Sequence, residues 1–151
     1  MPSREDVRRE LDKDELNYPR LATELGPEAL PQLQELVAED EPRIAPKAAY
    51  LAGLIAGPTS HEVVSLAAGS KHEVVRVAAA AALPALSAEH AGSIGEQLLA
   101  DPDVGVRARA VTAVGSFDEA LLTDQLRAIA EQDPEPAVRD LAAEIAQEPP
   151  G

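Results

Sequence analysis

The chain has 151 residues with no cysteine and no tryptophan, so disulfides and thiolate chemistry are excluded. Its 13 basic and 27 acidic residues give a formal net charge of −14, which repels nucleic-acid phosphates and anionic lipids. The N-terminal residues resemble no signal peptide, and the length suits one domain with a continuous core. We therefore expect a single cytoplasmic domain, residues 1–151, that binds neither membrane nor nucleic acid.

The N-terminal segment, residues 1–26, is expected to form a helical cap. Ser3 suits the N-cap of a charged helix over residues 3–17, with Val7 and Leu11 on a thin apolar edge. A second short helix is expected over residues 19–25. Terminal units of a stacked array need a polar outer side, which this composition supplies. The alternative is a mobile arm that grips a partner.

From residue 27 to residue 148, helices are expected in pairs. The first helices of the pairs are expected at residues 28–39, 60–68, 88–100 and 118–132. The second helices are expected at residues 42–56, 72–86, 102–114 and 134–147. The tail, residues 149–151, is expected to be frayed.

The clearest second helix follows Asp101 and shows how its ends are marked. Asp101 is expected to accept hydrogen bonds from the first-turn amides, with Pro102 in the first helical position. Gly115 is expected to end the helix in the left-handed conformation. A further copy starts at Asp133. In an upstream copy Ser70 replaces the acid, and a capping box with the glutamate three residues later is expected.

A basic residue recurs at the same place in each unit, at spacings of 29, 31 and 32 residues: Lys47, Arg76, Arg107 and Arg139. A period near 30 is typical of a stacked array. The pattern Asp-Pro-x-x-x-Val-Arg followed by Ala-Ala-x-Ala-Leu resembles the second helix of a HEAT-like repeat, of the short bacterial kind named after phycobilin lyases. The resemblance covers roughly residues 28–147. It implies an all-α, right-handed α–α superhelix, an armadillo-like solenoid of about four helix pairs behind the N-terminal cap.

The recurring basic residues are interpreted as structural. In the resembled family this arginine reaches acceptors in a neighbouring repeat, commonly the loop aspartate one unit away. Asp101 and Asp133 stand in those loops here. The interpretation is a structural Arg/Lys–Asp ladder formed by Lys47, Arg76, Arg107, Arg139, Asp101 and Asp133. Phosphate binding by the arginines is the alternative.

The second helices also predict which residues face the core and which face outward. Positions three, four, six and seven after the Val-Arg arginine are expected in the core, namely Ala79, Ala80, Ala82, Leu83, Ala110, Val111, Ala113 and Val114. Positions one, two and five places later face outward, along the concave side that second helices line in HEAT-like arrays. They are small or apolar where a solvated helix would be charged, and charge occurs only toward the C-terminal end. The predicted partner-binding residues are Ala49, Ala52, Val77, Ala78, Ala81, Ala108, Arg109, Thr112, Leu141 and Glu144.

Two other readings of this outward face remain open. Curvature of the array could crowd these positions so that only small residues fit. The N-terminal segment could also fold back and cover them.

No catalytic constellation is found. His61, His72 and His90 lack metal-ligand spacing, and there is no phosphate loop or nucleophile elbow. We therefore expect no enzyme activity, cofactor or metal. The favoured function is a non-catalytic scaffold that binds a protein or peptide with basic residues on the concave face. The resemblance implies two rivals. One is a phycobilin-lyase-like subunit that handles a bilin chromophore, and the other is a HEAT-like DNA glycosylase, which the acidity and the lack of tryptophan disfavour.

Overall fold

The computed structural model of the chain describes residues 2–118 and 120–147, and every regular element in that part is helical, which confirms the all-α prediction. Two short helices come first, α1 (Arg4–Leu11) and α2 (Tyr18–Leu25). The first helices of the pairs are α3 (Leu30–Glu39), α5 (Ser60–Ala68), α7 (Ala88–Leu99) and α9 (Thr123–Gln132). The second helices are α4 (Ala45–Leu54), α6 (Glu73–Ala82), α8 (Val104–Gly115) and α10 (Pro136–Gln147). The 3-10 turn η1 (Pro27–Ala29) precedes α3, and the 3-10 turn η2 (Leu83–Ala85) follows α6. The predicted frayed tail, residues 149–151, lies outside the described residues.

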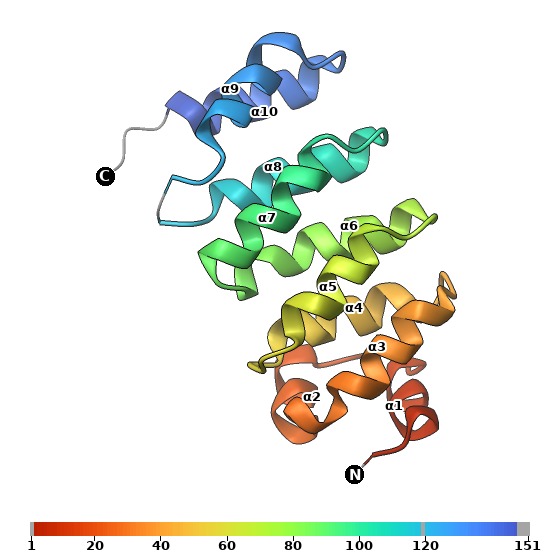
Figure 1. Ribbon diagram of the computed structural model, residues 1–151. Coiled ribbons are helices and arrows are strands. Elements are labelled where there is room, and N and C mark those ends of the chain that lie inside the picture. The colour runs from red at the N-terminus through yellow and green to blue at the C-terminus, as the bar shows by residue number, and fades with distance from the viewer. Residues whose placement is uncertain (1, 119, 148–151) are drawn as a thin grey trace.

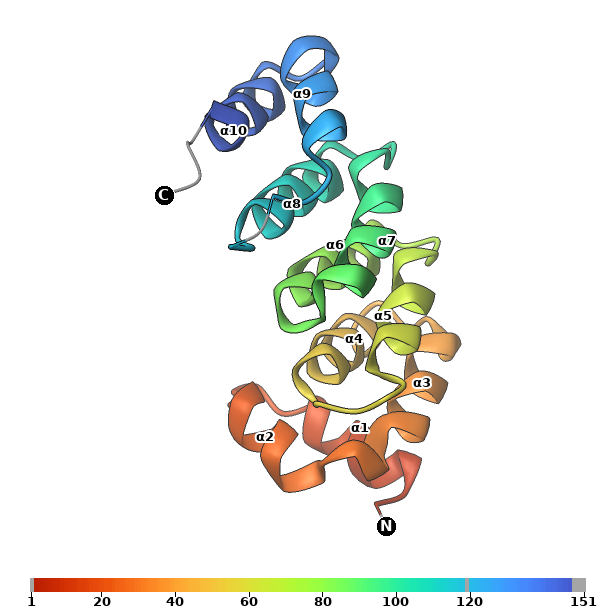
Figure 2. The same ribbon diagram turned by 60° about the vertical axis from the view of Figure 1, so that its left-hand side comes forward.

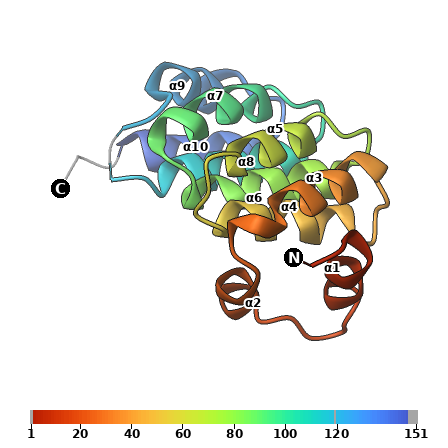
Figure 3. The same ribbon diagram turned by 60° about the horizontal axis from the view of Figure 1, so that its bottom comes forward.

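The helix pairs follow one another in two rows (Figure 1). In the second row α4, α6, α8 and α10 each pack on the next, and in the first row α3, α5 and α7 do the same. Figure 2 shows that the second row follows a shallow arc, with α2 and α10 at its two ends. Both N-terminal helices lie at the same end of the stack (Figure 3), α1 packed on α3 and α2 packed on α4. None of the described helices is both long enough and apolar enough to cross a bilayer.

Alanine is the most frequent residue type in the buried core. All eight positions predicted to lie in the core of α6, η2 and α8 are at most 4% exposed, which confirms that prediction. Small residues let the helices approach closely, and Gly53 on α4 marks one such contact. A Cβ built there would lie 2.8 Å from the Cβ of Ala82 on α6. The spacing of α4 and α6 therefore requires glycine at this position.

The helix starts differ from the predicted ones by a few residues. Asp101 does not cap α8. Asp103 does, accepting a hydrogen bond from Val106 N at 3.0 Å, so Pro102 lies before the helix. The carboxylate of Asp101 binds Arg76 and also accepts a hydrogen bond from Asp103 N at 2.9 Å, before the helix begins. The prediction for this helix start is therefore wrong by two residues.

Two further local predictions are wrong. Ser70 forms no capping box, because its hydroxyl accepts a hydrogen bond from His72 N and donates one to Asp40. Gly115 is helical and does not take the left-handed conformation. A Cβ on Gly115 would lie 2.6 Å from Cδ1 of Ile145 on α10. The glycine thus serves close packing of α8 on α10.

The N-terminal segment contains two helices, as predicted, with a different boundary. Ser3 caps α1 and forms a capping box with Asp6, which confirms Ser3 as the helix start. α1 ends at Leu11, six residues before the predicted end at 17. Asn17 instead caps α2, its side chain accepting a hydrogen bond from Arg20 N at 3.0 Å.

Candidate functional site

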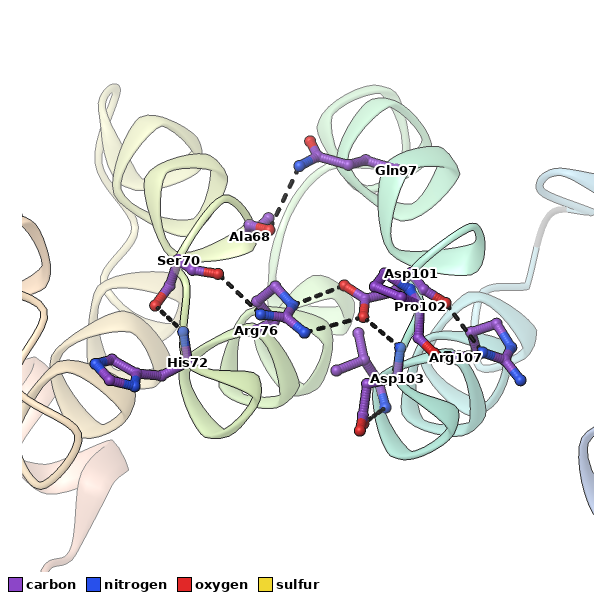
Figure 4. A network of polar contacts seen from close by, with 10 residues as sticks. Ala68, Ser70, His72, Arg76, Gln97, Asp101, Pro102, Asp103 and Arg107 are labelled. Carbon is purple, nitrogen blue, oxygen red and sulfur yellow. Dashed lines mark hydrogen bonds and ion pairs between the residues drawn. The ribbon is translucent and has the colours of Figure 1, made fainter.

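The arginine of α6 joins two successive repeats (Figure 4). Arg76 donates through Nε to Asp101 Oδ2 at 2.8 Å and through Nη2 to Oδ1 at 3.2 Å. Its Nη1 donates to the carbonyl of Ser70 in its own loop at 3.0 Å. The side chains of Arg76 and Asp101 are 15% and 6% exposed. This paired and nearly buried guanidinium is not available to a ligand.

The arginine of α8 repeats this geometry one unit further along. Arg107 donates to the two carboxylate oxygens of Asp133 at 2.8 and 3.1 Å, and its Nη1 donates to the carbonyl of Asp101 at 3.0 Å. Burial alone would raise the pKa of Asp133. The bonds from Arg107 and from Glu135 N, with the charges of Arg107 and Arg139, outweigh burial and lower that pKa below its ordinary value of 3.8. Asp133 is therefore held ionised by its partners.

The two outer members of the predicted ladder bond differently. Within the described part of the chain, Lys47 forms no ion pair with the loop of the next repeat, because Ser70 occupies the loop position that aspartate holds in later repeats. Its Nζ donates instead to the carbonyl of Leu11 at 2.8 Å. Arg139 keeps the bond within its own loop, from Nη1 to the carbonyl of Asp133 at 2.6 Å. The carboxylate pairing predicted for the whole set is thus found for Arg76 and Arg107.

A further arginine–carboxylate pair, not predicted from the sequence, involves α1. Arg8 Nη2 donates to both carboxylate oxygens of Glu41, at 2.9 and 2.7 Å. Glu41 lies six residues before Lys47, the same offset that separates Asp101 from Arg107. The signal was present in the dipeptide Val7-Arg8, which repeats the Val-Arg pair of the later second helices. The dipeptide was missed because it lies further from the next copy than the other copies lie from one another.

Two predicted partner-binding residues on α4 need correction. Ala49 and Ala52 are 0% exposed and belong to the hydrophobic core. The prediction that they contact a partner is therefore wrong. α2 packs on α4, buries its own Leu21 and Ala22, and sets Tyr18 edge-on against Tyr50 at a ring-centroid distance of 5.0 Å.

The corresponding positions on α6, α8 and α10 remain accessible. We call them the outward strip, and its members are Val77, Ala78, Ala81, Ala108, Arg109, Thr112, Leu141 and Glu144. Arg109, Thr112 and Glu144 are exposed, and the others are half-buried. Val77, Ala78, Ala108 and Leu141 also pack against the core. The strip is thus shallow and weakly apolar on α6, and becomes polar toward α10.

The histidines form a contact that the sequence did not predict. The imidazoles of His61 on α5 and His90 on α7 stack with a ring-centroid distance of 3.7 Å and an interplanar angle of 7°. Their spacing of 29 residues matches the repeat period, which places them side by side in the first row. Among the described residues, no group of three or more histidine or acidic side chains is arranged to hold a metal ion.

No family model matches the sequence, and no curated protein matches it.

Proposed function

We propose that the chain is a non-catalytic scaffold of HEAT-like repeats, wound as a right-handed α–α superhelix, that binds a protein or peptide on the outward strip. Two observations support the superhelix: the basic residues recur at a period near 30, and consecutive pairs form two packed rows. The strip lies on α6, α8 and α10, and these helices belong to the second row, which follows the arc in Figure 2. Its place in the cytoplasm is part of the same proposal.

The observation that carries the proposal is the accessibility of the outward strip on α6 and α8. Ala49 and Ala52 on α4 occupy the same repeat positions as Ala78 and Ala81 on α6, and both are 0% exposed. On α6 and α8 the equivalent positions are open, and a small, weakly apolar surface suits a bound helix or extended segment.

The charge distribution favours a partner with basic residues. The chain carries a net charge of −14, and Asp140 and Glu144 are exposed on α10 beside the strip. Arg109 is the basic residue of the strip and suits an acidic or carbonyl group at one point of the partner. Nucleic acid and anionic membranes are disfavoured by the same net charge.

Site-specific photocrosslinking tests this proposal. A benzoylphenylalanine is placed at Ala81 or Thr112 in the strip, and at the exposed Ser93 or Glu96 on α7 as a control. In cells that make the protein, we expect one crosslinked protein from both strip positions and none from the α7 positions. Mass spectrometry should locate the crosslink in a segment with lysine or arginine. Crosslinking of the same product from both rows, or from neither, would refute a binding role for the strip.

A further inference from the structure

The first helix binds the rest of the chain through one apolar edge. Val7 and Leu11, four residues apart on α1, are 0% exposed. α1 packs on α3, and Lys47 of α4 donates to the carbonyl of Leu11 at 2.8 Å. We call the surface that α1 covers on α3, α4 and their connecting loop the α1 seat. Its apolar part accommodates aliphatic side chains at positions i and i+4 of a helix.

Arginines of α1 complete the contact at the acidic rim of the seat. Arg4 Nη1 lies 2.7 Å from Glu39 Oε1, and Arg8 Nη2 contacts both carboxylate oxygens of Glu41. The two arginines are four residues apart, as are the two aliphatic residues. Any helix with arginine at i and i+4 and an aliphatic residue at i+3 and i+7 can therefore reproduce the face that α1 presents.

The acidic rim is positioned by the array and not by α1. Asp40, between the two glutamates, takes the left-handed conformation with φ of 56° at the end of α3. Its carboxylate accepts a hydrogen bond from Ser70 Oγ at 2.5 Å, in the loop of the following repeat. Neither the turn nor this bond involves α1. We therefore expect the backbone that carries the two glutamates to keep its course when α1 is away.

We propose that the α1 seat is a docking site for a basic amphipathic helix of a partner protein, and that α1 occupies it in the free chain. The side chains of both ion pairs are 39% to 46% exposed, so water and salt weaken them. α1 has eight residues and joins α2 through the six residues 12–17. A short terminal helix held by few buried groups opens before the repeats do. The site is separate from the outward strip, so it does not depend on the proposed function.

Titration of a fluorescein-labelled peptide with the sequence of residues 2–13 into the full-length chain tests the proposal. Reversing the charges of Arg4 and Arg8 (Arg4→Glu with Arg8→Glu) weakens the contact of the chain's own α1 with the α1 seat and leaves the residues of the seat unchanged. This variant should bind the peptide at least tenfold more tightly than the wild type. Reversing the rim (Glu39→Lys with Glu41→Lys) should abolish binding, and a peptide with glutamate at both arginine positions should restore it.

Two results would overturn the proposal. One is equal affinity of the wild type and the Arg4/Arg8 variant for the peptide, and the other is binding that survives reversal of the rim. A stable wild-type dimer in light scattering would assign the seat to α1 of a second copy and would also overturn the partner helix.

Hydrogen exchange on the wild type gives a second test that does not depend on folding of the variants. We expect amides 7–11 to exchange at least tenfold faster than those of α4 and α6. Exchange of α1 only with global unfolding would contradict a displaceable helix.

Discussion

Arg107 on α8 and Asp133 in the loop before α10 are joined by two hydrogen bonds of 2.8 and 3.1 Å, and their side chains are 11% and 4% exposed. Two residues further along the same helix, Arg109 is exposed. The same residue type thus has a structural role at one position and faces solvent at the other. The pair offers a matched comparison of the two roles.

Replacing Arg107 with alanine should lower the free energy of unfolding by about 3 kcal/mol, because the carboxylate of Asp133 stays buried without its partner. Arg109→Ala should change it by less than about 0.5 kcal/mol, as an exposed substitution usually does. Urea unfolding of both variants measures the difference. Equal effects would show that the buried pair contributes no more than a surface side chain.

Acid should destabilise the protein in part through Asp133. Its pKa is lower in the folded chain than the ordinary 3.8, so its stabilising contribution is complete above that value. The contribution should be lost as pH falls from about 3.8 through the lower folded pKa. Asp133→Asn should therefore lower stability at pH 6 but reduce the further loss between pH 6 and pH 3. Asp124→Asn, at a side chain that is 97% exposed, serves as the control and should leave the pH dependence unchanged.

The same substitution at one repeat position should have different effects on two helices. Ala52 on α4 is fully buried, so Ala52→Glu places an unpaired charge in the core and should cost more than about 3 kcal/mol. Ala81 on α6 is half-buried, and Ala81→Glu should cost less than about 1 kcal/mol. Thermal unfolding of both variants checks this. A similar loss at both positions would mean that the strip is core and not surface.

Close packing of α4 on α6 predicts a further contrast. Gly53→Ala should destabilise the chain by about 1–3 kcal/mol, because its Cβ would meet the Cβ of Ala82 at 2.8 Å and the carbonyl oxygen at 3.3 Å. Gly92→Ala on α7 meets nothing within 4 Å and should stabilise by about 0.5–1 kcal/mol through helix propensity. Calorimetry of the two variants decides whether space or propensity governs each glycine.

Local patterns in the sequence predicted the helices and the core-facing residues of α6 and α8. The Val-Arg frame placed Ala79, Ala80, Ala110 and Val111 in the core because the helical period fixes which residues share a face. Helix starts were less predictable. Asp101 is a residue type that often caps helices, yet Asp103 caps α8, and the carboxylate of Asp101 binds Arg76 of the preceding repeat, a contact that depends on tertiary structure.

Exposure of the outward face could not be predicted from composition. Ala52 and Ala81 are the same residue at the same repeat position, yet Ala52 is 0% exposed and Ala81 is half-buried. The assignment of outward positions that fits α6 therefore does not carry over to α4, whose buried residues include Ala48, Ala49 and Ala52. The pairing of Arg8 with Glu41 and the stacking of His61 on His90 were also found only in the structure.

Asp101 serves two neighbours at once, its carboxylate receiving Arg76 and its carbonyl receiving Arg107. Disturbing this loop therefore releases α6 of the preceding repeat and α8 of its own repeat together. The middle of the array should unfold cooperatively, without a stable intermediate in which the repeat on one side of the Asp101 loop is folded and the repeat on the other side is unfolded. Asp133 makes the same two bonds, to Arg107 and Arg139, whereas at the N-terminal end Glu41 receives Arg8 and Lys47 bonds to Leu11 instead. Fraying should therefore begin at the N-terminal end.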